Sequence, residues 1–185
     1  AGSVIYFSDD ANLRNMMQKR CMEETRLGIP MIFGHDVIHG YRTIAPVPLA
    51  QAASWNPDLV RTISRDAAKE AYYGGLDWTF SPMVDIARDP RWGRVMEGYG
   101  EDPYLTSVFC KAAVEGYQGN DLSAEGSIAA CLKHFVGYGA SEAGRDYVYT
   151  EISDQALWDT YLPSFHAGVE SGAATVMSAF NNISG

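Results

Sequence analysis

A lysine and a histidine stand side by side, as Lys133 and His134, near the end of an apolar run over residues 127–139. Short apolar runs closed by glycine are typical of strands that are buried on both faces of a parallel sheet. Because an unpaired ammonium group is costly to bury, we expect both side chains to face a polar pocket at the end of the strand. The alternative is a strand end that is polar by chance, and other stretches of the sequence must decide between the two interpretations.

Polar side chains follow other apolar runs in the same way. The further clusters are Asp36, His39 and Arg42, then Arg91, Arg94 and Glu97, and finally Asn181 and Asn182. In a parallel barrel the carboxyl ends of successive strands meet at one face, which is where such folds keep their sites. The clusters therefore predict one shared ligand-binding pocket, and Trp92 is the tryptophan expected closest to it.

The elements that must position these clusters alternate along the chain. Strands are predicted within residues 2–7, 29–33, 78–85, 127–135 and 174–182, and helices within 8–28, 56–74, 102–116 and 153–172. The helices start at the capping residues Asp9 and Asp10, Asn56, Asp102 and Ser153, and Pro163 is expected to bend the last one. Such alternation predicts an α/β fold of about five βα units on a parallel sheet. A closed (β/α)8 barrel needs eight units and ~250 residues, so we expect a partial TIM-like barrel, incomplete without its C-terminal remainder.

The composition disfavours several classes of partner. The chain has 185 residues and a formal net charge of −9, whereas phosphate binding needs clustered Lys and Arg. We therefore expect no nucleic-acid partner and no membrane partner, and no apolar run is long enough to span a bilayer. Cys21, Cys110 and Cys131 have no CxxC spacing and are interpreted as buried free thiols, which leave the compartment open. We expect a periplasmic or secreted location rather than a cytoplasmic one.

Two other chemistries fit single features of the sequence. His35 and His39 have a spacing that would suit a metal on a helix, but Gly34 and Gly40 flank them and disfavour a helix. We expect no metal, and we interpret His39 as a residue that orients its loop by hydrogen bonds. Lys133 is placed like lysines that form Schiff bases at the strand ends of barrels. No motif for an electron-sink cofactor accompanies it, and no cofactor is expected.

Four motifs, in their order along the chain, resemble the first domain of family 3 glycoside hydrolases, and of the β-glucosidases in particular. They are GIPMIFGHDVIHGYRT, SPMVDIARDPRWGRVMEGYGEDP, CLKHFVGYGASEAGRDY and VMSAFNNISG. The resemblance spans nearly the whole chain. It implies that residues 1–185 are the N-terminal portion of a single family 3 barrel domain, ending before the strand that carries the nucleophile.

The resemblance implies roles for the polar clusters. In that family the aspartate of the D-x-x-H-G stretch, here Asp36, binds hydroxyls of the non-reducing terminal sugar. The arginine that ends R-W-G-R, here Arg94, and the pair Lys133 and His134 bind other hydroxyls. These roles agree with the chemistry of the residues, because a charged donor or acceptor aimed at a neutral hydroxyl makes a charge-assisted hydrogen bond.

Other positions match the family less completely. Arg42 and Arg145 correspond to residues that contact the sugar in some members. Glu97 is expected to fix the guanidinium of Arg94 on the side away from the sugar. Relatives that cleave N-acetylglucosamine carry a KHFPGHG run and a histidine in a D-S-H loop. Here the run is KHFVGYG and the loop has no histidine, which disfavours a hexosaminidase. Many members also have a tyrosine where Phe180 stands.

The two catalytic carboxylates of a retaining glycosidase are expected beyond Gly185. They must lie ~5 to 5.5 Å apart, one as nucleophile and one as acid/base. In the family the nucleophile is an aspartate on the strand after VMSAFNN, and the acid/base glutamate comes from a later domain. No catalytic residue is therefore expected in this chain.

The resemblance implies a β-glucosidase that removes terminal non-reducing β-D-glucosyl residues with retention. Its substrate would be a β-glucoside or an oligosaccharide, and this chain would need the remainder of its own barrel and a C-terminal domain as partners. Two alternatives stay open, which are a non-catalytic sugar-binding barrel and a Schiff-base lyase that uses Lys133.

Overall fold

A computed structural model of the chain describes residues 2–8 and 10–185. The strands are β1 (Ser3–Ile5), β2 (Ile32–His35), β3 (Trp78–Thr79), β4 (Cys131–Phe135) and β5 (Thr175–Ser178). The α-helices are α1 (Ala11–Glu23), α2 (Pro48–Ala52), α3 (Pro57–Tyr73), α4 (Pro103–Gln118), α5 (Asp154–Ala156) and α6 (Pro163–Glu170). Short 3-10 turns are η1 (Val95–Glu97), η2 (Tyr138–Ala140) and η3 (Glu142–Gly144), and a π-helical turn spans Leu157–Tyr161. In the described part of the chain, no helix has the length and apolar character needed to cross a membrane.

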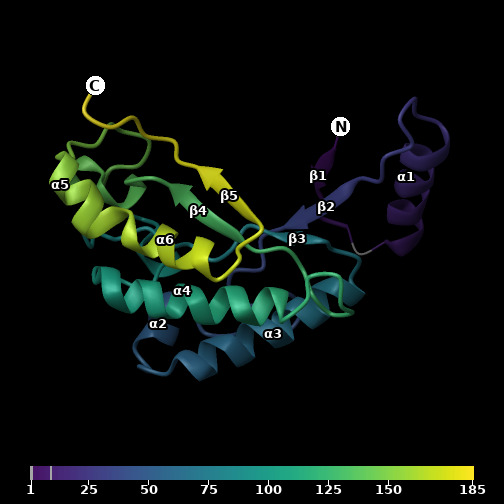
Figure 1. Ribbon diagram of the computed structural model, residues 1–185, viewed down its shortest axis with the longest axis horizontal. Helices are drawn as coiled ribbons and strands as arrows, with labels where there is room; N and C mark the ends of the chain where they lie inside the picture. Colours follow the sequence, from purple (N-terminus) through teal and green to yellow (C-terminus); the bar gives the residue numbers. More distant parts are fainter. Residues whose placement is uncertain (1, 9) are drawn as a thin grey trace.

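The strands form a run of parallel pairings that curves through the molecule (Figure 1). β1 pairs with β2, β2 with β3, and β4 with β5, all in parallel. Parallel bridges from Trp78 to Ala129 and from Met83 to Lys133 connect the first three strands to the last two. The predicted α/β arrangement with a parallel sheet is confirmed. Asp36 and Asn181 come after the carboxyl ends of β2 and β5, whereas Lys133 and His134 lie within β4.

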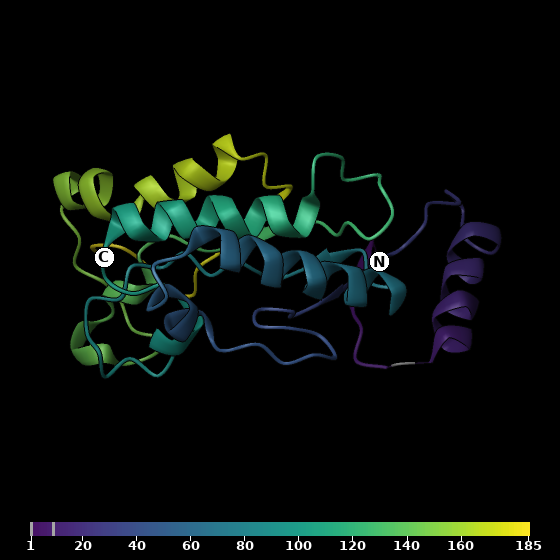
Figure 2. The same cartoon turned by 90° about the horizontal axis from the view of Figure 1, so that it is seen from below.

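Three helices cover one face of the sheet, with α4 between α3 and α6 (Figures 1 and 2). Three predicted caps are present here, because Asn56 accepts a hydrogen bond from the N–H of Leu59 at 3.2 Å, Asp102 accepts one from Leu105 at 2.6 Å, and Ser153 at the start of α5 accepts one from Ala156 at 3.2 Å. The close approach of α3 and α4 depends on Gly116, where a Cβ would lie 2.6 Å from the carbonyl oxygen of Arg61. The core between helices and sheet is built from apolar residues of both, including Phe33, Val60, Ala68, Phe109, Val114, Ile128 and Leu132.

Helix α1 departs from the usual pattern of a helix packed on its sheet. Its cap is as predicted, because the Asp10 side chain accepts hydrogen bonds from the first turn, while Asp9 lies outside the described residues. None of the described residues of α1 is buried, and the helix stands apart from the other helices in both views (Figures 1 and 2). Contacts from Gln18 to Met31 and from Arg14 to Gly75 hold it to the body.

Three local expectations are corrected. The third strand is shorter than residues 78–85, because a proline at position 82 has no N–H to donate to a neighbouring strand. The last helix is not one bent helix but α5, the π-helical turn and α6, and Pro163 begins α6 rather than bending a continuous helix. Helix α2 occupies a stretch for which the sequence predicts no helix.

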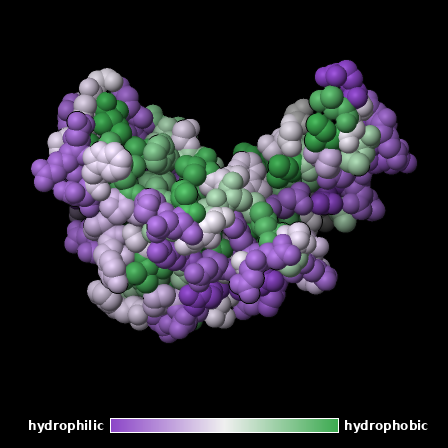
Figure 3. All heavy atoms as spheres, in the orientation of Figure 1, coloured by the Kyte–Doolittle hydropathy of each residue, from purple (hydrophilic) through white to green (hydrophobic). Residues whose placement is uncertain are grey.

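We expect the isolated 185-residue chain to self-associate. Within the described residues β1 and β5 each have a strand partner on one side only, and such edges template pairing between chains. Apolar residues also line the notch between the arm that carries α1 and the rest of the molecule (Figure 3). Light scattering after size-exclusion chromatography, combined with a thermal melt, checks this expectation. A monomer that melts cooperatively would contradict it.

Candidate active site

Lys133 lies at the centre of the polar cluster. It is on β4 and is only 2% exposed, although it carries an ammonium group. Its Nζ donates to Oδ2 of Asp36 at 2.7 Å and lies 3.8 Å from Oε2 of Glu97. Asp36 follows β2 and Glu97 ends η1, so one buried cation on β4 connects the segments that follow β2 and β3. The two carboxylates offset the cost of burying this charge, which agrees with the expectation that Lys133 faces a polar pocket.

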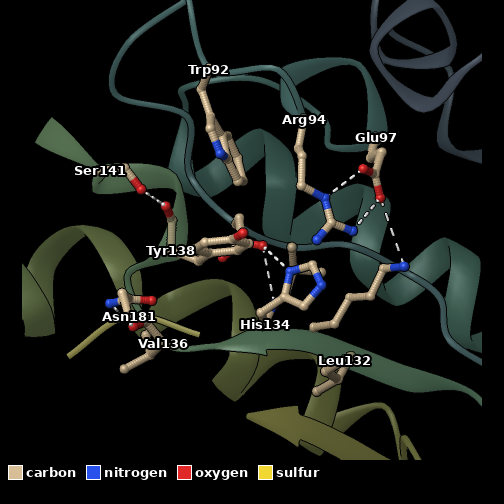
Figure 4. A network of polar contacts seen from close by, with 12 residues as sticks. Trp92, Arg94, Glu97, Leu132, His134, Val136, Tyr138, Ser141 and Asn181 are labelled. Atoms are coloured by element: carbon tan, nitrogen blue, oxygen red, sulfur yellow. Dashed lines mark hydrogen bonds and ion pairs between the residues drawn. The ribbon is translucent and has the colours of Figure 1, made fainter. Parts of the chain in front are cut away.

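Arg94 and Glu97 form a bidentate ion pair beside Lys133 (Figure 4). Nε and Nη2 of Arg94 donate to the two carboxylate oxygens at 2.6 and 2.8 Å, and the guanidinium lies 5.7 Å from the centre of the Tyr138 ring. Burial alone would raise the pKa of Glu97, but the hydrogen bonds and charge of Arg94 and the charge of Lys133 outweigh it and lower that pKa. The expected contact of Glu97 with Arg94 is present, and it leaves Glu97 ionised as an anchor.

His134 is held by an aspartate that the sequence reasoning did not single out. Oδ2 of Asp85 lies 2.8 Å from Nδ1 of His134 and accepts the backbone N–H of the same residue at 3.0 Å. Both side chains are buried, and the peptide bond between Lys133 and His134 is cis. Tyr138 packs edge-on against the imidazole with 5.2 Å between ring centres. An acid at the end of the apolar run 78–85 was the signal that could have identified Asp85.

Trp92 and Tyr138 form an aromatic wall of the cluster (Figure 4). Their ring centres are 5.2 Å apart, and Trp92, the tryptophan expected closest to the site, is buried. Asp146 joins them, because it accepts a hydrogen bond from Nε1 of Trp92 at 3.2 Å and another from the hydroxyl of Tyr138. Burial, together with the nearby carboxylate of Asp146, raises the pKa of Tyr138, which therefore stays protonated as a donor.

Arg42 and Arg145 lie on loops away from these contacts. The backbone N–H of Arg42 donates to Glu70 on α3 at 2.9 Å. Arg145 is exposed, and its backbone N–H donates to the carbonyl of Glu142 at 3.2 Å. Among the contacts of the described residues, none joins either arginine side chain to Lys133. The structure thus gathers Asp36, Arg94, Lys133 and His134, and it leaves the roles of the other two arginines as predictions.

A family model described as the glycosyl hydrolase family 3 N terminal domain matches residues 2–185 of the chain. The chain belongs to glycosyl hydrolase family 3. The match covers almost every residue, which agrees with the resemblance carried by the four sequence motifs.

Individual relatives of this family 3 chain are longer than it is. A periplasmic beta-glucosidase of Salmonella typhimurium is 45% identical over 169 residues, which are 91% of this chain and 22% of that protein. A beta-xylosidase of Formosa agariphila is 35% identical over 95% of this chain and 26% of its own length. The crystal structure of beta-glucosidase from Listeria innocua in complex with gluconolactone matches with a TM-score of 0.94 and 46% identity, over 100% of this chain and 26% of that one. The chain spans about a quarter of the length of such relatives, and its parallel sheet is part of a TIM-like barrel.

The family 3 cluster offers several hydrogen-bonding groups to a neutral polyol but no free carboxylate pair. Asp36 is paired with Lys133, Glu97 with Arg94, and Asp85 is occupied by His134. Asp36 has the most exposed side chain of the three carboxylates, with an exposed fraction of 42%. An exposed acceptor beside a buried ammonium group is suited to bind adjacent hydroxyls of a sugar, because the two charges hold each other in place.

The family 3 chain has histidine and cysteine side chains, which are of the types that could bind a metal. His39 lies 3.0 Å from the carbonyl of Ala45 through Nδ1, which confirms that it orients its loop. Among residues 2–8 and 10–185, no group of three or more His, Cys, Asp or Glu side chains is arranged to hold a metal ion. Cys110 and Cys131 are buried free thiols as predicted, and burial raises the pKa of Cys110 to about 12. Cys21 is only partly buried, because it lies on α1, none of whose described residues is buried.

Proposed function

We propose that the protein containing this chain is a β-glucosidase that removes terminal non-reducing β-D-glucosyl residues with retention. The observation that carries the proposal is the cluster around buried Lys133, whose ammonium group holds the exposed carboxylate of Asp36 at 2.7 Å at the carboxyl end of a barrel sheet. Relatives named as beta-glucosidases, from Salmonella typhimurium and Listeria innocua, support it. A beta-xylosidase among the relatives makes xylose the sugar to compare with glucose.

In this proposal residues 1–185 are the N-terminal portion of one barrel domain and supply the sugar-binding half of the site. Asp36, Arg94, Lys133 and His134 bind hydroxyls of the terminal sugar, as their shared cluster supports. Arg42 and Arg145 contact the sugar from their loops. The nucleophilic aspartate and the acid/base glutamate come from outside this chain, as do the remaining strands of the barrel and a C-terminal domain.

The test is to express the whole protein and assay it with aryl β-D-glucosides and β-D-xylosides. Proton NMR of the first sugar released identifies its anomer, and retention predicts the β-anomer. Binding of glucose without turnover would favour the non-catalytic alternative. Trapping of a carbonyl substrate on Lys133 by borohydride would favour the Schiff-base alternative.

We propose a periplasmic or secreted location for the whole protein. The support is the periplasmic beta-glucosidase of Salmonella typhimurium, which is 45% identical to this chain. Fractionation of cells that produce the whole protein tests the proposal, and activity confined to the cytoplasmic fraction would contradict it.

A further inference from the structure

Asp85 and His134 form a buried pair beneath the sugar-binding cluster. The Asp85 side chain is fully buried and His134 is 2% exposed. We infer that Asp85 is a positioning residue that keeps a hydrogen on Nδ1 of His134, so that Nε2 is the ring atom left for a sugar hydroxyl. The kinetic test of this inference rests on the proposed function, whereas the spectroscopic test does not.

The hydrogen-bonding pattern determines which ring nitrogen carries the hydrogen. An ionised carboxylate only accepts hydrogen bonds, so the 2.8 Å contact between its Oδ2 and Nδ1 needs a hydrogen on Nδ1. The opposite tautomer of His134 would place a lone pair against the buried carboxylate. Partners of this kind commonly set both the tautomer and the orientation of a functional histidine.

The surroundings leave Asp85 with no other charged partner among the described contacts. Its Oδ2 is occupied by the backbone N–H and by Nδ1 of His134, and its Oδ1 is buried without a hydrogen-bond partner in the described residues. The imidazole is confined by Tyr138 at 5.2 Å and by Phe180 at 6.2 Å between ring centres. Figure 4 shows the ring beside Tyr138 and toward the Arg94–Glu97 pair, so its free nitrogen belongs to the cluster that binds the sugar.

The kinetic test is Asp85→Leu in the whole protein. Leucine has nearly the same shape but accepts no hydrogen bond, so Nδ1 of His134 loses its acceptor, whereas the amide oxygen of an asparagine could still accept both hydrogen bonds that Oδ2 accepts. We expect kcat/KM for an aryl β-glucoside to fall by about 10- to 100-fold. In a His134→Ala background the same substitution should change kcat/KM by less than about 2-fold, because Asp85 acts through His134. Asp66→Leu on the exposed side of α3 is the matched control and should leave kcat/KM unchanged.

The spectroscopic test uses the unaltered whole protein, labelled with 15N at histidine, in which the His134 signal is identified by its loss in His134→Ala. We expect a hydrogen on Nδ1 in the unaltered protein and its transfer to Nε2 in Asp85→Leu, in which Nδ1 has no acceptor. A hydrogen on Nε2 alone in the unaltered protein, a near-unchanged kcat/KM in Asp85→Leu, or an equal loss in both backgrounds would overturn the inference. If the whole protein cleaves no glycoside, the proposed function fails while the NMR result still decides the role of Asp85.

Discussion

Replacing Lys133 with methionine in the whole protein is expected to lower kcat/KM for an aryl β-glucoside by about 30- to 1000-fold, which corresponds to ~2 to 4 kcal/mol of lost transition-state stabilisation. Methionine keeps much of the volume of the buried stem but removes the charge. Asp36 and Glu97 then lose the ammonium group that lies 2.7 and 3.8 Å from them. The sugar loses one charged donor, and the carboxylate of Asp36 loses the group that orients it.

Two further variants separate recognition from a general loss of structure. Asp36→Ala should lower kcat/KM to a similar extent, because it removes the other half of the pair. Lys69→Met on the exposed face of α3 changes the same residue type away from the cluster and should have no effect. Thermal unfolding of each variant shows whether it is folded. A folded Lys133→Met protein with a near-normal specificity constant would show that the pocket is wrongly placed.

The 185-residue chain alone is expected to show no glycosidase activity and no covalent labelling by a 2-deoxy-2-fluoro glucoside, whereas the whole protein should be labelled on one residue. The carboxylates of the cluster are already paired, Asp36 with Lys133, Glu97 with Arg94 and Asp85 with His134. None is left to attack an anomeric carbon, since a retaining enzyme needs a free nucleophile and an acid/base ~5 to 5.5 Å apart.

Intact-mass measurement after incubation with the fluoro sugar gives the result for both proteins. The whole protein should gain the mass of one sugar, because the fluorine slows breakdown of the covalent intermediate. Heat-denatured whole protein is the control for non-specific labelling. A sugar attached to any residue between Ala1 and Gly185 would place the nucleophile inside this chain and overturn the assignment.

Features that depend on neighbouring residues were predictable from the sequence. The helix starts at Asn56 and Asp102 followed from capping chemistry, because a cap bonds to a backbone N–H three residues away. The parallel α/β arrangement followed from the alternation of apolar runs and amphipathic helices. The ion pair of Arg94 with Glu97 was also expected, because the two residues are only three positions apart.

The sequence by itself therefore determined the family, the alternation of strands and helices, and four residues of the cluster, which are Asp36, Arg94, Lys133 and His134. Tertiary structure alone decided how distant residues pair, since the register between strands, and not local propensity, brings together Asp36 and Lys133 across 97 positions and Asp85 and His134 across 49. It also decided that α1 has no buried face among the described residues, because the burial of a helix depends on what packs against it.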